Sequence, residues 1–243
     1  MISFLRKVRM KLLGNGRFSQ YLLYALGEIF LVVIGILIAL QINTWNENRK
    51  QRIYELKMLK ELSNTLQKDK RYLSSLVTRL DQKEKSVNRL LEIRETGFEN
   101  LDTIGRYFQS LRTEILFQYN SGPYESIKAG GIDKISKDSI RTAMEDLYEF
   151  LIPRTEKILD KLEASNEQEE ALMEKLTTRE ILVRNSTKII QRVVSDPKII
   201  YQDEFLHLLQ LNKSNTYVSR SRIEAILPGM SKLDSMIQLE LLR

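Results

Sequence analysis

Residues 21–42 read YLLYALGEIFLVVIGILIALQI, an apolar run that carries a single charged side chain, Glu28. At about 1.5 Å per residue, a helix of this length spans roughly 33 Å, which is about the thickness of a hydrocarbon core. A buried helix of a water-soluble protein seldom continues this far without a polar face. We therefore predict one transmembrane helix over residues 21–43.

The two ends of this run carry residues that favour the membrane–water interface. Tyrosine and tryptophan gather at that depth, and basic side chains are attracted to anionic headgroups. The expected interfacial anchors are Tyr21, Tyr24, Trp45, Arg6, Lys7, Arg9 and Lys11. The apolar core exceeds the ~7–15 residues of a cleaved signal peptide, and no small-x-small cleavage site follows it, so we expect an uncleaved anchor.

Residues 1–20 form a short basic arm with five Lys and Arg residues and no acid. Five basic residues also lie within residues 43–60, so the charge bias is small, but it favours a cytoplasmic N-terminus. The rest of the chain would then lie in the periplasm of a Gram-negative cell. The lipid bilayer is the first expected partner.

Residues 21–48, YLLYALGEIFLVVIGILIALQINTWNEN, resemble the N-terminal signature of a family of single-pass membrane proteins from Bacteroidota, a domain of unknown function. A shorter resemblance to the same family covers Tyr124 to Lys128, with Gly131 and Ile135 downstream. The resemblance implies the inner membrane of a Gram-negative bacterium. It brings no catalytic residue with it.

One face of the predicted membrane helix combines the only acid of the run with small residues. At helical spacing this face comprises Ala25, Glu28, Val32, Gly35 and Ala39. Small residues four apart allow two membrane helices to approach closely, and an acid within a span is costly enough to indicate a function. We predict a contact with a second copy or with another membrane protein. A proton path through Glu28, or a glutamate that only tunes packing, are the alternatives.

Residues 44–96 predict a long helix in a coiled coil or antiparallel bundle, because apolar residues recur there in a 3-4 pattern. The seam comprises Leu59, Leu62, Leu66, Leu73, Leu76, Leu80, Val87 and Leu90. The same register places Asp69 and Lys83 on the seam. We expect both of these polar residues to be solvated.

Residues 97–243 predict the remaining helices of an all-α ectodomain. Gly97 should end the long helix. The expected helices are 100–117, 124–129, 138–176 with an interruption at Pro153, 203–211, and 217–242 with a bend near Pro228. Ser136 or Asp138 is the expected cap of the third. Residues 181–201 are rich in β-branched side chains, but we favour a helix there because a strand would lack a partner.

The composition argues against several classes of function. The chain has no cysteine and a single histidine, His207, which we expect to be a partly buried structural residue and not a metal ligand of a Glu-x-x-His pair with Glu204. Residues 43–243 hold 33 basic and 31 acidic residues, which is no electrostatic footprint for nucleic acid. The loop at residues 119–126 and Gly130–Gly131 match no nucleophile or phosphate-binding motif.

We therefore expect a membrane-anchored helical scaffold or interaction subunit, with no cofactor, no metal and no catalysis. The first alternative is a periplasmic ligand-binding domain similar to the four-helix bundle of a sensor. The second is a stator-like subunit that uses Glu28 within the membrane.

Overall fold

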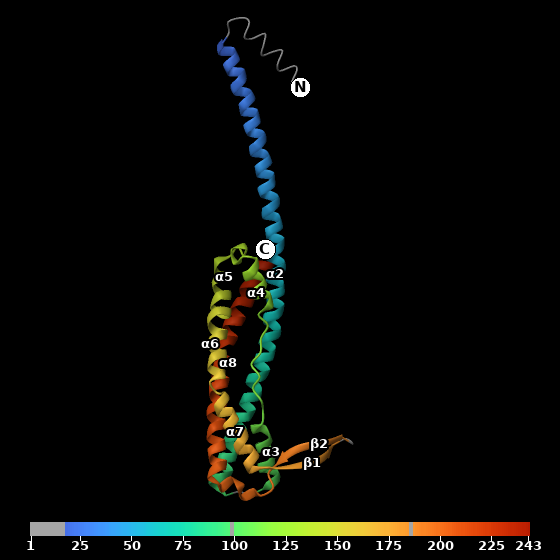
Figure 1. Cartoon of the computed structure of the whole chain (residues 1–243), viewed down its shortest axis with the longest axis vertical. Helices are drawn as coiled ribbons and strands as arrows, with labels where there is room; N and C mark the ends of the chain where they lie inside the picture. Colours follow the sequence, from blue (N-terminus) through green and yellow to red (C-terminus); the bar gives the residue numbers. More distant parts are fainter. Residues whose placement is uncertain (1–17, 98–99, 185–186) are drawn as a thin grey trace. The chain divides into compact units, whose positions relative to one another are not determined.

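The computed structural model describes residues 18–97, 100–184 and 187–243, which are mostly helical (Figure 1). The helices are α2 (Phe18–Thr96), α3 (Leu101–Leu111), α4 (Gly122–Gly130), α5 (Asp138–Glu145), α6 (Ile152–Asp160), α7 (Glu163–Leu176) and α8 (Asp203–Leu241). Two strands, β1 (Thr178–Arg184) and β2 (Thr187–Val193), two short 3-10 turns (Ile132–Lys134 and Pro197–Tyr201) and a π-helical turn (Asp146–Leu151) complete them. The chain divides into two compact units between Glu55 and Leu56.

The first unit contains the apolar run, which forms the N-terminal part of α2. This helix is long and apolar enough to cross a membrane. Its large apolar side chains are exposed, from 45% at Val33 to 70% at Leu31, and Trp45 is 65% exposed. Residues 1–17, with the predicted anchors Arg6, Lys7, Arg9 and Lys11, and the side chains of Tyr21 and Tyr24 lie outside the described residues.

In the second unit α2 and α8 lie side by side and antiparallel. Ser63 donates to Asp234 at 2.5 Å, Arg220 donates to Asp81 at 2.7 Å, and Arg94 donates to the carbonyl of Ile200, so residue numbers fall along one helix as they rise along the other. The eight apolar seam residues predicted on α2 are all at most 1% exposed. The predicted burial of this face is confirmed.

Beyond α2, the chain departs from the predicted helix at residues 112–117. Gly97 ends α2 in the left-handed region at φ +74°, and Asn100 caps α3 by accepting from the amide of Thr103 at 2.9 Å. However, α3 stops at Leu111, and residues 112–121 run along α2, without helix over residues 113–120 (Figure 1). We call this segment the strap.

Side chains of α2 hold the strap in its extended form. Lys83 donates to the carbonyl of Thr113 at 3.4 Å, Tyr72 donates to the carbonyl of Leu116, and Asp69 accepts the amide of Asn120 at 2.9 Å. Along the strap Thr113, Ile115, Phe117 and Tyr119 are half-buried, whereas the residues between them are exposed. This alternation has the period of a strand, which is why the helical prediction to residue 117 is wrong.

The predicted interruption near Pro153 is present as the π-helical turn Asp146–Leu151, which α6 follows. The expected side-chain cap is absent from α5, whose N-cap position is Lys137. In α8, Gly229 follows Pro228 and faces the π-helical turn, where a Cβ would lie 3.2 Å from Leu151 Cδ1. Glycine therefore allows α8 to approach this turn closely.

Strands β1 and β2 pair antiparallel, an arrangement that we call the hairpin, where we had favoured a helix for residues 181–201. Ile181 pairs with Ile190, and Thr178 pairs with Val193. The β-branched run supplies both strands, so each half is the partner that seemed to be missing. The hairpin projects from the helical unit, beside α3 and α7 (Figure 1).

Candidate functional site

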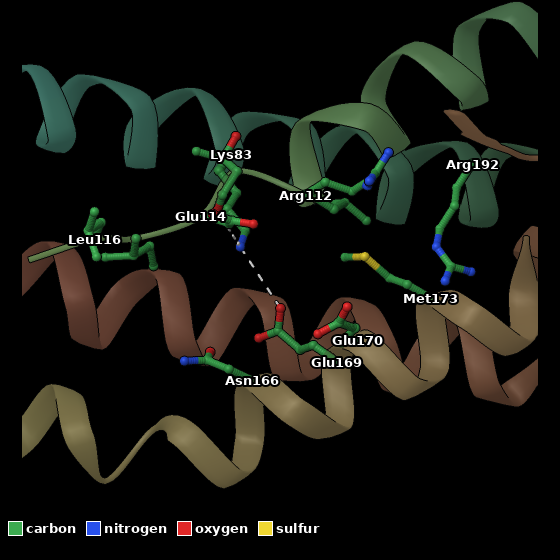
Figure 2. Close-up of a pocket in the computed structure, with 12 residues that line it drawn as sticks. Lys83, Arg112, Glu114, Leu116, Asn166, Glu169, Glu170, Met173 and Arg192 are labelled. Carbon is green, nitrogen blue, oxygen red and sulfur yellow. Dashed lines mark hydrogen bonds and ion pairs between the residues drawn. The ribbon is translucent and has the colours of Figure 1, made fainter. Parts of the chain in front are cut away.

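The interior of the second unit contains a layer of polar side chains. Lys83 on α2 and Glu169 on α7 are each 5% exposed, and their Nζ and Oε2 atoms lie 3.9 Å apart (Figure 2). Apolar seam residues, Leu80 and Val87, precede and follow Lys83 on α2. A buried ion pair therefore interrupts the apolar seam of α2.

α8 contributes a stripe of polar residues to the same layer. The stripe comprises Asn212, Asn215, Thr216 and Ser219, which are at most 3% exposed. Their spacing of three, four and seven residues places them on one helical face. Asn212 and Asn215 donate through their Nδ2 atoms to the two carboxylate oxygens of Glu169, and Ser165 of α7 bonds to Asn215. Glu169 is therefore fixed by α8 as well as by Lys83.

Our prediction that α8 consists of two helices, 203–211 and 217–242, is wrong. The intervening residues 212–216 include two asparagines and a serine, residue types that favour turns. In the structure α8 is continuous, since Glu169 satisfies the amides of Asn212 and Asn215 inside the core. The helix continues through these residues, and the Nδ2 atoms of Asn212 and Asn215 find partners across the interface.

Burial disfavours the charged form of both members of the ion pair. It raises the pKa of the Glu169 carboxyl and lowers the pKa of the Lys83 ammonium, and the attraction between them opposes both shifts. Lys83 is incompletely satisfied, because its contacts at 3.4 Å and 3.9 Å exceed the ~2.7–2.9 Å of a charge-assisted hydrogen bond. Among the described residues, Asn212 Oδ1 and Thr216 Oγ1 also have no hydrogen-bond partner.

A cleft of about 370 Å³ opens beside Lys83, between the strap, α7 and the hairpin (Figure 2). Its charged lining is balanced, with Lys83, Arg112 and Arg192 against Glu114, Glu169 and Glu170. In Figure 2 the side chains of Lys83 and Glu169 point toward each other across the gap, and the guanidinium of Arg192 lies beside Met173. The cleft therefore offers both cationic and anionic groups to a ligand.

A second cavity of about 660 Å³ adjoins the first, and both are lined by Ile115 and Leu116 of the strap and by Asn166 of α7. The charged residues that line this second cavity are all acidic: Glu156, Asp160 and Glu163. The strap thus borders one cavity with a buried ammonium and another with an acidic wall.

The residues predicted to make a membrane contact are exposed in the first unit. Glu28, Val32, Gly35 and Ala39 are exposed, Ala25 is half-buried, and no described atom lies within 4 Å of a Cβ built on Gly35. The face is therefore open within the described chain. Its contact with another helix stays a prediction, because it concerns a second molecule.

His207 is exposed, so our prediction of partial burial is wrong. Its Nε2 lies 3.0 Å from Nε2 of Gln168, and its predicted neighbour Glu204 instead pairs with Lys175 at 2.7 Å. The described residues contain no group of three or more histidine, aspartate or glutamate side chains that could hold a metal ion.

The expectation that Asp69 and Lys83 are solvated is also wrong. Lys83 is buried against Glu169, and Asp69 is half-buried and accepts an amide of the strap. Burial raises the pKa of Asp69, against the lowering effect of that hydrogen bond and of Lys68. Sequence reasoning placed both residues on the buried seam but missed Glu169. The polar residues on one face of α8 were the signal in the sequence that could have indicated a charged partner on a neighbouring helix.

The family comparison covers most of this architecture. A family model described as "Family of unknown function (DUF6090)" matches residues 28–193, from the apolar run to the last residue of β2. No curated protein and no solved structure matches the chain.

Proposed function

This chain belongs to that family of unknown function, and on this premise we propose that it is a membrane-anchored helical subunit that acts as a scaffold or interaction partner. The observation that carries the proposal is the exposed apolar surface of residues 22–42. Transfer of apolar surface out of water contributes about 25 cal/mol per Å², so a bilayer stabilises such a helix strongly.

The proposed arrangement is a single span at residues 21–43, with residues 1–20 in the cytoplasm and the helical part in the periplasm. Two features support an antiparallel bundle of long helices in that part. The α2 seam is buried in a 3-4 pattern, and polar contacts join α2 to α8 along its length. We propose no catalytic step.

Membrane insertion is tested by alkaline carbonate extraction of cells that produce the full chain. We expect the chain in the membrane pellet, because carbonate releases peripheral proteins but not spanning helices. A cysteine placed at Ser235 in this cysteine-free chain should react with a membrane-impermeant maleimide from the periplasmic side. Full extraction into the supernatant would contradict the anchor, and labelling only after lysis would contradict the orientation.

The proposed partner on the membrane face is a second copy of the chain or another membrane protein. The face presents Glu28 beside Gly35 and Ala39, and close approach at small residues favours helix association. Gly35→Cys should form disulfide-linked dimers in membranes under mild oxidation. Gly27→Cys is the matched control, since Gly27 is equally open but points about 100° away from Glu28 on a helix. Equal crosslinking of both variants, or of neither, would contradict a second copy on this face.

A second candidate function is ligand binding, as in a sensor domain. The cleft beside Lys83 favours it, because a concave site with convergent polar groups is typical of small-molecule binding. Thermal unfolding of the full chain in lipid nanodiscs, measured against a panel of charged and neutral small molecules, tests it. A saturable rise in melting temperature supports ligand binding, and an unchanged temperature across the panel contradicts it.

A further inference from the structure

Lys83 carries an ammonium whose hydrogen-bonding capacity is largely unused. An ammonium has three N–H donors, yet the contacts of Lys83 are a carbonyl at 3.4 Å and a carboxylate oxygen at 3.9 Å. Glu169 is better satisfied, since Asn212 and Asn215 donate to both of its oxygens. The unmet demand in this pair is therefore for an anionic acceptor at Lys83.

The cleft leaves room for such an acceptor beside Lys83. Lys83 is only 5% exposed, but it lines the 370 Å³ cavity together with Thr113 of the strap. A carboxylate in this cavity would accept from Nζ in place of the distant Thr113 carbonyl. Low local dielectric makes such a charge-assisted hydrogen bond stronger than it would be in water.

The acidic lining of the adjoining cavity favours a cationic group. Its acids lie on α6 and at the start of α7, whereas Ile115 and Leu116 of the strap line both cavities. Glu114 and Glu170 also line the first cavity, but a carboxylate alone would leave the acidic wall without a cation, and an ammonium alone would leave Lys83 without a further acceptor. A molecule with both groups satisfies the two ends together.

We propose that the paired cavities beneath the strap bind a small zwitterion, an amino acid or a short amino-acid chain, with its carboxylate on Lys83 and its ammonium toward Glu156, Asp160 and Glu163. This inference rests on the second candidate function and is independent of the membrane anchor. Glu169 competes with the ligand carboxylate for Lys83. Removal of the Lys83 ammonium and removal of the Glu169 charge should therefore change the affinity for the zwitterion in opposite directions.

The full chain in lipid nanodiscs is titrated calorimetrically with glycine, 4-aminobutanoate and 6-aminohexanoate at constant ionic strength. Hexanoate and hexylamine are the matched probes that carry only one of the two charges. We expect at least one zwitterion to bind saturably, and at least tenfold more tightly than hexanoate or hexylamine.

Two substitutions assign the carboxylate end. Lys83→Met should weaken zwitterion binding at least tenfold, whereas Glu169→Gln should strengthen it several-fold because Lys83 loses its competing partner. Lys85→Met is the control, since Lys85 is exposed and lies two residues after Lys83 on α2, and this variant should bind as the unchanged chain does. If Lys83→Met fails to fold, Glu169→Gln still decides the outcome, because it keeps the ammonium.

Three results would overturn the inference: absence of binding by all three zwitterions, equal affinity for hexanoate, or unweakened binding by a folded Lys83→Met chain. Weaker binding by Glu169→Gln would equally exclude the assigned carboxylate position. If a neutral molecule raised the melting temperature while no zwitterion bound, the second candidate function would stand and this inference would fail alone.

Discussion

The two stretches of α2 place their side chains in opposite ways. Between Leu22 and Ile42 large apolar side chains are exposed, whereas beyond Leu56 the same helix buries Lys83, a charged residue, at 5% exposure. Each stretch reverses the rule that apolar residues lie inside and charges outside. The difference teaches that each exception needs its own remedy. Polar partners surround Lys83, whereas the first stretch is long and apolar enough to cross a membrane, which is the environment that we propose for it.

The largest expected effect comes from placing charges in the apolar stretch. The double substitution Val33→Arg and Leu37→Arg should remove the chain from the membrane, because each arginine near the centre of a span costs about 2.5–3.5 kcal/mol on insertion scales. Carbonate extraction measures the loss. The control is Asn48→Arg with Gln51→Arg, two exposed positions of α2 beyond the run, which should leave the chain in the pellet.

A double variant that remained in the carbonate pellet would show that residues 22–42 are not the anchor. A lipid environment would then not explain the exposed apolar side chains of the first stretch, and this surface would need a protein partner instead.

The next effect concerns the buried ion pair. Lys83→Met should lower the free energy of unfolding by about 3–5 kcal/mol, because it leaves Glu169 charged, buried and without its cation. Adding Glu169→Gln should restore most of this loss, since the pair is then neutral and the amide can still bond to the two asparagines. Chemical denaturation followed by circular dichroism measures both. Lys85→Met should stay within about 0.5 kcal/mol of the unchanged chain.

If Lys83→Met and the double variant were equally unstable, the charge of Lys83 would not be the cause. The loss would then come from its aliphatic chain or from the Thr113 contact that holds the strap.

The sequence predicted the apolar elements of this molecule well, because hydrophobic periodicity is read from the residues alone. The α2 seam is buried as expected, Gly97 ends the helix, and Pro153 follows an interruption. These features depend on local chemistry: side-chain spacing, a left-handed glycine, and a proline without an amide proton.

The polar features could not be predicted in the same way, since their exposure depends on partners far away in the sequence. Lys83 meets a carboxylate 86 residues later, and Glu169 meets amides 43 and 46 residues beyond itself. The prediction of a helix at residues 181–201 failed for a related reason. It treated the residues of both strands as one helix, whereas β1 pairs with β2. Only the folded chain shows which polar residues satisfy one another.

The pH dependence of stability should separate Glu169 from other carboxyls. Burial raises the folded-state pKa of Glu169 above the ordinary value of a glutamate carboxyl, 4.5, so the folded state holds this proton more tightly than the unfolded state does. The resulting stabilisation is complete below pH 4.5 and is lost as pH rises through the folded pKa. Glu169→Gln lacks this loss, so the unchanged chain should lose stability relative to the variant as pH rises from about 4.5 toward neutral.

Subtraction of the two denaturation series at each pH removes the titrating groups that do not interact with Glu169, so the difference reports Glu169 together with its partner Lys83. A difference that is flat with pH, or that changes in favour of the unchanged chain, would mean that Lys83 and the two asparagines fully offset the burial of the carboxylate.

The smallest expected effect lies at the hairpin, where exposed apolar residues occur outside the proposed membrane helix. Ile190 is 71% exposed and its cross-strand partner Ile181 is 65% exposed, values close to those of the apolar stretch of α2. Replacing both with threonine, which keeps β-branching, should change the free energy of unfolding by about 0.5 kcal/mol or less and leave the chain in the carbonate pellet. Leu76→Ala on the buried seam should cost about 2–5 kcal/mol in the same assay.

A loss at the hairpin comparable to that of Leu76→Ala would mean that the isoleucine pair is covered in the folded protein. A small loss would mean that exposure of single residues carries little information, and that continuity of the apolar surface over residues 22–42 is what distinguishes the proposed anchor.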